Sequence, residues 1–208
     1  MAAPTYPLTH PTDVGFKQSK FSIARAVAVA ESPFTGAQQV HEYDRAQWKA
    51  VMTLPPMKRE TAAKWIAFFM KLHGRKGTFL LGDPDAKTAQ GSITGSVTLG
   101  ASISIGDYDI DLATTANNIT DAFKAGDYIQ IDTGGSSKLH MIVEDADTDG
   151  TGAATVTVEP PIKVARTLGT TVTYAGAQGL FRMDTSELGW DADYLSRFGI
   201  TFSCTEAI

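Results

Sequence analysis

The stretch FSIARAVAVAESPFTGAQQVHEYDRAQWKAVMTLPP, residues 21–56, decides the fold. Its first residues place a large side chain at every second position, which is the period of a half-buried β-strand. Residues 32–36, SPFTG, have turn chemistry, and residues 46–54 then alternate in the same way until Pro55 and Pro56 end the run. The stretch therefore predicts a long β-hairpin. The alternating residues are Phe21, Ile23, Arg25, Val27 and Val29 on the first strand and Ala46, Trp48, Ala50, Met52 and Leu54 on the second.

Arg25 interrupts the apolar row of the first strand. Two interpretations are open: a buried charge that is paired, or the point at which the strand leaves the core. Because arginine is rarely fully buried, the second interpretation is favoured.

Residues 57–74, MKRETAAKWIAFFMKLHG, predict a single helix at about residues 58–73. Apolar residues recur three and four positions apart, and Glu60 near the start with Lys71 near the end suits the helix dipole. Gly74 is a stop signal. Aromatic residues at helical spacing are more often core than a partner-binding surface, so we assign them to the core. These aromatic residues are Trp65, Phe68 and Phe69.

The segments at the far end of the chain predict the rest of the same sheet. Residues 77–83, GTFLLGD, and residues 181–183 are short β-compatible runs, and residues 198–204 alternate up to Cys204. Nothing near this last run in sequence can cover its apolar side. We therefore expect it to join the N-terminal hairpin in one sheet.

Residues 88–176 differ in composition from both flanks. They contain four Lys and Arg against eleven Asp and Glu, a net charge of −7, whereas the remainder carries 14 against 12. Such a shift predicts an inserted domain. The predicted division is a hub β-sandwich with the helix, built from residues 1–88 and 177–208, and an inserted small β-barrel at residues 89–176.

Short β-compatible runs separated by turn residues fill the inserted segment. Their spacing of roughly ten residues is typical of a small OB-like barrel or a sandwich, so the fold class is mainly β with one helix. Residues 139–144 and 154–159 are expected to form a hairpin. The runs are SITGSVTL (92–99), SISI (102–105), DYDIDL (107–112), DYIQID (127–132), KLHMIVED (138–145), AATVTVEP (153–160) and TTVTY (170–174).

The loop of that hairpin, DADTDGTG at residues 145–152, opens like an EF-hand calcium loop. Counted from Asp145, however, Val156 stands at the twelfth position, where a bidentate glutamate is required. No helix is predicted on either side. We therefore expect a solvated hairpin tip without an ion. The carboxylates concerned are Asp145, Asp147 and Asp149.

The composition excludes several classes of protein. With 43% hydrophobic and 20% charged residues in a chain of 208, a substantial core can form. A net charge of −5 argues against a protein that wraps nucleic acid. The longest apolar runs fall far below the roughly 18 residues that a membrane span needs. The single Cys204 cannot form an internal disulfide, and we recognise no targeting segment.

No residue pattern typical of metal or nucleotide chemistry stands out. The four histidines occur without HExxH or a CxxC pair, and GxSxG is absent. The GDPDAK segment, residues 82–87, lacks the glycine spacing of a phosphate loop. For Cys204 and His140, a buried thiol and an exposed strand histidine are favoured over a catalytic pair.

Clustered carboxylates are the remaining candidates for catalysis. Pairs of this kind act as acid and base in glycosidases, but in β-rich loops we interpret them as polar surface residues. The carboxylates are Asp191 and Asp193, and Asp107, Asp109 and Asp111. We therefore predict no catalytic, cofactor-binding or metal-binding residue, no cofactor, and no enzyme.

Residues 18–85 taken together resemble the N-terminal half of distal tail (Dit-like) baseplate hub proteins of long-tailed bacteriophages. The features that carry the resemblance are a long ribbon ending in W-x-x-x-x-x-L-P-P-M (48–57), the single helix, and G-R-x-G-T-F-L-L-G-D (74–83). AGDYIQI (125–131), KLHMIVED and TVTVEP look like the inserted barrel of such proteins, and FGITFSCTEA (198–207) looks like the strand that completes the hub.

The resemblance implies a structural virion protein of the phage tail tip. Such a subunit forms a hexameric ring at the distal end of the tail, after assembly in the host cytoplasm. Implied partners are the tail tube protein, baseplate hub or tail fibre proteins and the tape measure protein. DNA passes through the channel without sequence-specific binding, and no membrane insertion is implied.

Two other functions stay open. Within the same virion the chain could be a tail tube or tail-completion subunit on a related fold. From another class, the barrel could be a carbohydrate- or receptor-binding module, since small barrels bind ligands through one face and its loops. The aromatic residues of the inserted segment are Tyr108, Phe123, Tyr128 and Tyr174, and at least two of them are expected to fill its core.

Overall fold

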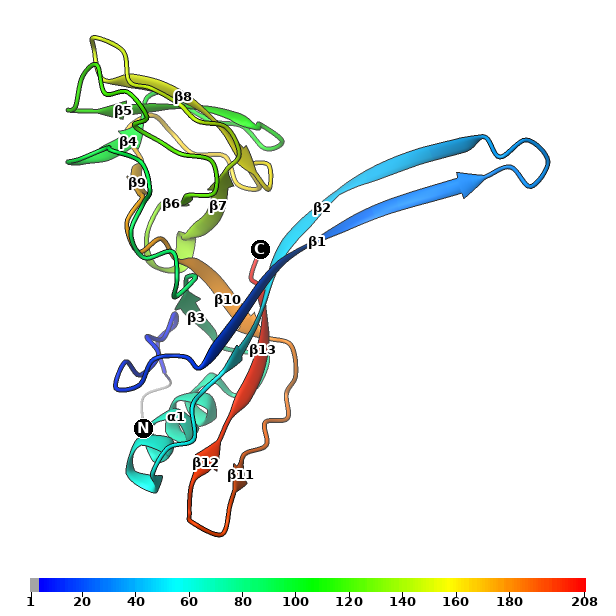
Figure 1. Cartoon of the computed structure of the whole chain (residues 1–208), viewed down its shortest axis with the longest axis vertical. Coiled ribbons are helices and arrows are strands. Elements are labelled where there is room, and N and C mark those ends of the chain that lie inside the picture. Colours follow the sequence, from blue (N-terminus) through cyan, green and yellow to red (C-terminus); the bar gives the residue numbers. More distant parts are fainter. Residues whose placement is uncertain (1–3) are drawn as a thin grey trace.

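The computed structural model describes residues 4–208, apart from the side chains of residues 44 and 45. Within that part of the chain the structure is mainly β, with one α-helix and a closed antiparallel barrel, so the predicted fold class is confirmed. The hub and the barrel lie at opposite ends of the long axis, and a two-stranded ribbon projects away from both (Figure 1).

The hub contains a five-stranded antiparallel sheet in the order β1-β2-β13-β10-β3. Strand β13 lies between β2 and β10, with Phe202 opposite Met52 and Cys204 opposite Ala50. The prediction that the last strand joins the N-terminal hairpin is therefore confirmed. The strands are β1 (Gln18–Glu31), β2 (Gln38–Thr53), β3 (Thr78–Leu81), β10 (Gly179–Met183) and β13 (Thr201–Glu206).

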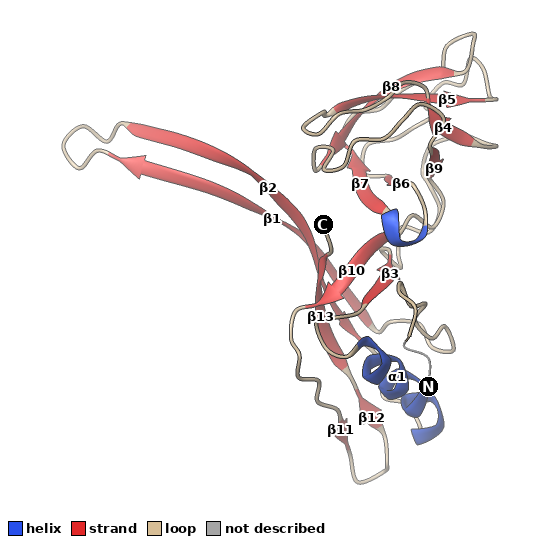
Figure 2. Cartoon of the chain, turned by 180° about the vertical axis from the view of Figure 1, so that it is seen from behind, coloured by secondary structure: helices blue, strands red, loops and turns tan. Residues whose placement is uncertain are grey.

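Helix α1 (Arg59–Leu72) packs against this sheet and begins and ends within one residue of the predicted bounds (Figure 2). Lys58 is the N-cap residue and its side chain makes no capping bond. His73 ends the helix in the left-handed conformation, with φ of 52°. The aromatic side chains predicted to be core are buried: Trp65 is 0% exposed, and Phe68 and Phe69 are each 5% exposed.

The predicted final strand at residues 198–204 is divided in two, which corrects the sequence-based interpretation. Strand β12 (Phe198–Gly199) pairs with β11 (Asp191–Ala192), and β13 begins only at Thr201. The break arises because the backbone of Phe198 exchanges two hydrogen bonds with Met57, at 2.8 and 3.1 Å, on the far side of the double proline.

The barrel is closed by six antiparallel strands in the order β4-β5-β8-β7-β6-β9. Residues 102–105, predicted as a strand, make only a single bridge, between Ile103 and Arg166. The strands are β4 (Val97–Leu99), β5 (Asp109–Thr114), β6 (Tyr128–Ile131), β7 (Lys138–Ile142), β8 (Ala153–Glu159) and β9 (Thr171–Thr173), with a short 3-10 helix η1 (Gly134–Ser136) before β7. All six lie within the predicted insertion, whose boundaries remain a prediction.

Strands β7 and β8 form the predicted hairpin, with Ile142 opposite Val158, and the three carboxylates of its connection, Asp145, Asp147 and Asp149, are exposed as expected. Ala146 exchanges two backbone hydrogen bonds with Phe123, at 2.9 and 3.0 Å. The Asp147 carboxylate accepts a bond from the Asp121 backbone N–H at 2.7 Å. The connection therefore exposes its carboxylates while its backbone packs along residues 118–125, a contact that the sequence did not predict.

The barrel and the hub share part of their core. Tyr128 and Leu139, on barrel strands, belong to the buried cluster that contains Trp48 and Phe181 of the hub. A Cβ at Gly179 would lie 2.9 Å from the Cβ of Leu139, so the first residue of β10 must be small. The barrel is therefore packed onto the hub and not merely joined to it.

Candidate interaction surface

The β1–β2 ribbon has two halves that are both antiparallel but differ in register, across a bulge after Arg25, and in their surroundings. In the rooted half, residues 18–25 pair with residues 46–53. Phe21 lies opposite Ala50 and Ile23 opposite Trp48, and all four contribute to the hub core. The alternation seen in the sequence is explained here by burial of one face.

The projecting half, which we call the arm, comprises residues 26–43 and leaves the body without covering elements on either face (Figures 1 and 2). Alternation continues along β1, so positions that face the core in the rooted half continue as Val27 and Val29. Val40 lies directly opposite Val29. These three valines, here called the valine face, are 48%, 58% and 62% exposed in chain order.

The opposite side of the arm carries small residues on one strand and rings on the other. Ala26, Ala28 and Ala30 lie opposite Tyr43, His41 and Gln39, respectively. The rings of His41 and Tyr43 meet edge to face, with centroids 4.6 Å apart. We call this side the alanine face, defined by the three alanines and bordered by the two rings.

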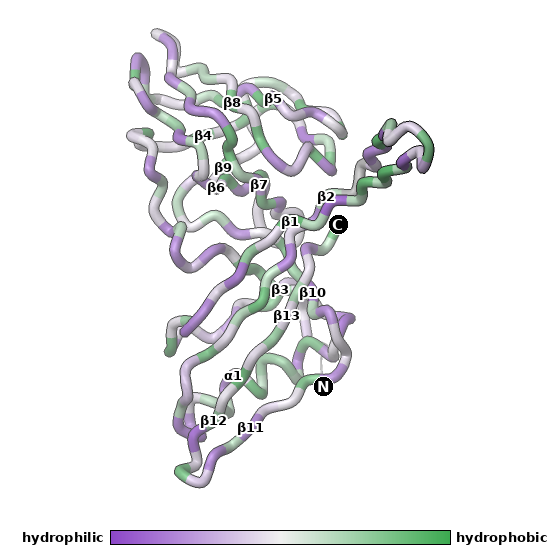
Figure 3. The backbone as a smooth tube through the Cα atoms, turned by 45° about the vertical axis from the view of Figure 1, so that its right-hand side comes forward, coloured by the Kyte–Doolittle hydropathy of each residue, from purple (hydrophilic) through white to green (hydrophobic). Residues whose placement is uncertain are grey.

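The tip of the arm presents a single large aromatic residue. Phe34 is 94% exposed, between Ser32 and Gly36 of the turn. The Gly36 backbone N–H donates to the Ser32 carbonyl at 2.9 Å, and Gly36 has φ of 68°, in the left-handed region that favours glycine. Hydrophobic residues thus extend to the far end of the ribbon (Figure 3).

Arg25 marks the transition between the two halves, next to a β-bulge. Its guanidinium forms ion pairs with Glu159 of the barrel at 2.7 Å and with Glu42 of the arm at 3.4 Å. The Arg25 side chain is 34% exposed. Both interpretations from the sequence therefore hold in part, because Arg25 is paired and also stands where the strand leaves the body.

A cleft of about 490 Å³ opens between the base of the arm and the barrel. Arm residues Glu42 and Tyr43 form one wall, and Ile105 and Tyr108 of the barrel form the other. Ile105 is 72% exposed and Tyr108 is 43% exposed. Apolar side chains are therefore exposed on both walls of this cleft.

Buried polar groups fix the arm's root to the barrel, and sequence reasoning missed them. Glu206 accepts a hydrogen bond from the backbone N–H of Trp48 at 3.3 Å and pairs with Lys163 at 2.5 Å. Lys138 donates to the Ala207 carbonyl at 2.6 Å. Burial lowers the pKa of Lys138. No sequence motif marks this cluster, because its members come from distant parts of the chain: Glu206 from β13, Lys138 from β7 and Lys163 from the loop after β8.

His140 and Cys204 do not form a pair. His140 was expected to be exposed, but it is 2% exposed, and its Nδ1 lies 2.7 Å from the Pro160 carbonyl. Burial, aided by the charges of Lys163 and Lys138, lowers the pKa of His140 to about 4. Cys204 donates instead to the Ala50 carbonyl, and burial raises the pKa of its thiol.

The carboxylates singled out in the sequence mostly serve as local hydrogen-bond acceptors. Asp109 accepts from Thr157 at 2.6 Å, and Asp111 accepts from Thr155 at 2.7 Å, across paired strands. Asp193 accepts from two backbone N–H groups of its own turn. Asp149 does the same in the connection between β7 and β8. In the part of the chain that the structure describes, no group of three or more His, Cys, Asp or Glu residues is placed to hold a metal ion.

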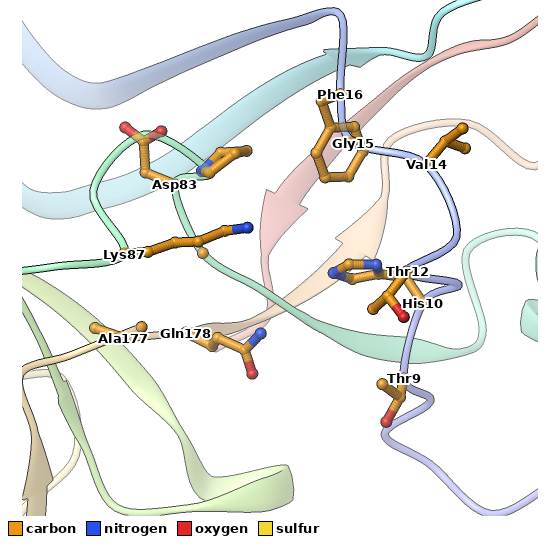
Figure 4. A pocket seen from close by; sticks show the side chains of 13 residues that line it. Thr9, His10, Thr12, Val14, Gly15, Phe16, Asp83, Lys87, Ala177 and Gln178 are labelled. Carbon is orange, nitrogen blue, oxygen red and sulfur yellow. The ribbon is translucent and has the colours of Figure 1, made fainter.

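A pocket of about 360 Å³ lies where the N-terminal segment meets the chain entering and leaving the barrel. Figure 4 shows Lys87 reaching in from one side, with Phe16 and His10 on the other. The His10 ring is stacked on Trp65, with ring centroids 5.8 Å apart, and its Nδ1 lies 3.0 Å from the Pro11 carbonyl. Asp83 accepts from the backbone of Asp85 at 3.2 Å. The polar atoms of His10 and Asp83 in this pocket therefore have local hydrogen-bond partners.

The chain matches no protein-family model, and no curated protein is significantly similar to it in sequence. In residues 4–208, no helix combines the length and apolarity that crossing a membrane requires. The arm therefore remains the surface whose geometry most directly suggests a function.

Proposed function

We propose that this chain is a structural virion protein of a phage tail tip, a distal tail ring subunit that joins the tail tube to the baseplate or tail fibre. The observation that carries the proposal is the arm, whose apolar residues continue the core face of the hub sheet beyond the body. Such a surface is typical of a contact between subunits. A ring of identical copies would cover every arm by symmetry.

The edges of the hub sheet support the same proposal. The N-terminal segment pairs at Leu8 with Phe79 of β3, whereas the outer edge of β1 has no strand beside it in the described residues. Unpaired edges invite pairing with another chain.

Partners follow from the proposed position in the particle. Other copies of the chain would form a hexameric ring, flanked by the tail tube protein and by baseplate hub or fibre proteins, with the tape measure protein inside.

Immunogold electron microscopy of tailed particles that contain this chain tests the proposal. Label at the tail tip is expected, and label along the tube or at the head would reject the distal position. Native mass spectrometry of the purified chain provides a second readout, for which we expect hexamers or an approach to them with concentration. A monomer at all concentrations that binds host glycans would favour the alternative, a carbohydrate- or receptor-binding module.

A further inference from the structure

The two faces of the arm differ in the size of their side chains. On the valine face, Val29 and Val40 form a directly opposed pair, with Val27 beside them, so this face has a raised apolar ridge. On the alanine face, Ala28 and Ala30 stand out little from the backbone. The rings of His41 and Tyr43 rise beside them, so this face has a trough with one wall.

A ridge on one face and a trough on the other are complementary in shape. We propose that the arms of neighbouring copies stack front to back, with the valine face of one copy seated in the alanine trough of the next. This inference rests on the proposed function, in which copies of the chain assemble into a ring. It adds which surfaces of neighbouring copies are in contact. Small residues facing large ones allow two β-layers to interdigitate.

The charges on the arm favour this arrangement over a symmetric pair. Glu31 and Glu42 share the valine face with the three valines, because each lies at an alternate position on that side. Two valine faces in contact would bring four carboxylates together, and only the two of Glu42 are ion-paired in the described residues, each with Arg25 of its own copy. The charge of Glu31 would stay uncompensated in such a pair, which is unfavourable. The alanine face carries His41, Tyr43 and Gln39 in place of acidic side chains, so a valine face can approach it without like-charge repulsion.

The symmetry of the contact also indicates that a second copy of this chain occupies the alanine trough. Front-to-back contacts are heterologous, and identical copies joined in this way close into a ring or continue as a filament. A front-to-front pair would end at a dimer and leave both alanine faces exposed. A two-stranded ribbon by itself is only marginally stable in water, and stacking gives each arm a layer on both sides.

Disulfide trapping tests the stacking directly. Ala28→Cys protein is mixed in turn with Val27→Cys, Val29→Cys and Val40→Cys protein, allowed to assemble, and oxidised. A disulfide requires Cβ atoms about 4 Å apart, whereas equivalent positions on stacked β-layers lie about 10 Å apart. We expect a shift from monomer to cross-linked dimer on a non-reducing gel for at least one mixture, and no dimer from any single variant.

Two controls keep the result interpretable. Native Cys204 is buried at 0% exposure and does not contribute. Val143→Cys, at an exposed valine of the barrel, mixed with Ala28→Cys should give no dimer. Dimers from Ala28→Cys or Val29→Cys alone would show a symmetric or edge-to-edge pair and overturn the proposal. The absence of dimers from all three mixtures would also overturn it.

A bulky substitution provides an independent readout. Ala28→Trp would fill the trough without disturbing the body, and we expect it to remove the assembled species in native mass spectrometry. Ala153→Trp, at an exposed alanine of β8, is the matched control and should assemble normally. Full assembly of Ala28→Trp would contradict front-to-back stacking.

The test separates this inference from the proposed function. Cross-linked arms in a protein that is absent from the tail tip would keep the stacking and reject the position in the virion. Label at the tail tip without any cross-link would keep the position and reject the stacking.

Discussion

The rooted half of the β1–β2 ribbon and the arm are two parts of the same pair of strands, yet they end in opposite environments. In the rooted half, Trp48 is 5% exposed and Met52 is 0% exposed. In the arm, Val29 and Val40, on the same face of the ribbon, are 58% and 62% exposed. On β1 the apolar alternation continues from the rooted half into the arm, whereas on β2 the same face of the arm carries Gln38 and Glu42 beside Val40. Apolar alternation therefore predicts which face of a strand is covered. It does not identify the molecule that covers this face.

Truncation in the rooted half should have the largest effect on stability. Trp48→Ala removes a buried ring whose Nε1 donates to the Leu139 carbonyl at 2.8 Å, so it also opens the contact between hub and barrel. We expect a loss of about 4 kcal/mol in the free energy of unfolding. Urea denaturation followed by circular dichroism measures the loss. A loss as small as that of Val40→Ala in the arm would contradict the contrast between the two halves.

Breaking the buried ion pair should have the next largest effect. Glu206→Gln leaves Lys163, whose side chain is 9% exposed, without its counter-charge. Removing one partner of a buried pair costs about 3 kcal/mol, so the urea midpoint should fall strongly. Asp13→Asn, which breaks the exposed pair with Lys64, is the matched control and should leave the midpoint nearly unchanged. Equal effects would show that the Glu206 pair is not a structural link.

Acid should weaken the body through His140. The pKa of His140 is about 4 in the fold, against 6.5 as its ordinary value, so between these values the unfolded chain binds a proton that the folded chain does not. Stability therefore falls as the pH is lowered from 6.5 towards 4, by an amount on the order of 2 kcal/mol. His140→Asn keeps a donor for the Pro160 carbonyl and should flatten this dependence in urea titrations. An unchanged slope would exclude His140 as the cause.

Substitution on the valine face should have the smallest effect on the folded monomer and a large effect on assembly. Val29→Thr keeps a β-branched side chain and changes the free energy of unfolding by less than about 0.5 kcal/mol. Because its apolar contact is lost, native mass spectrometry should show less assembled protein. Val143→Thr applies the same change to an exposed valine of the barrel and should assemble like the unmodified chain. A reduction in both variants would argue against a specific role of the arm.

Most of the fold could be predicted from the sequence, because local patterns carried it. Alternation at residues 21–29 and 46–54 predicted the ribbon, and the spacing of Trp65 and Phe69 predicted the helix. The break before Thr201 could not be predicted from local patterns. It coincides with hydrogen bonds between Phe198 and Met57, two residues that are far apart in the chain. The contact between the connection at residues 145–152 and residues 118–125 could not be predicted for the same reason.

The candidate surface was less predictable than the fold. Val27 and Val29 were correctly placed on the apolar side of a strand, and Arg25 was correctly favoured as the point where the strand leaves the core. The sequence does not show, however, that both faces of the ribbon beyond Arg25 are exposed. The buried cluster of Glu206, Lys163 and Lys138 has no signature in the sequence, since charged residues are usually exposed. Both features arise from how the barrel packs on the hub, which no local pattern encodes.

Hydrogen–deuterium exchange at low and high protein concentration tests the central claim most directly, because it reports on both halves of the ribbon at once. We expect the amides of residues 26–43 to exchange more slowly when the protein assembles, while those of residues 46–53 stay protected at both concentrations. Assembly without any slowing in residues 26–43 would contradict the assignment of the arm as the contact between copies.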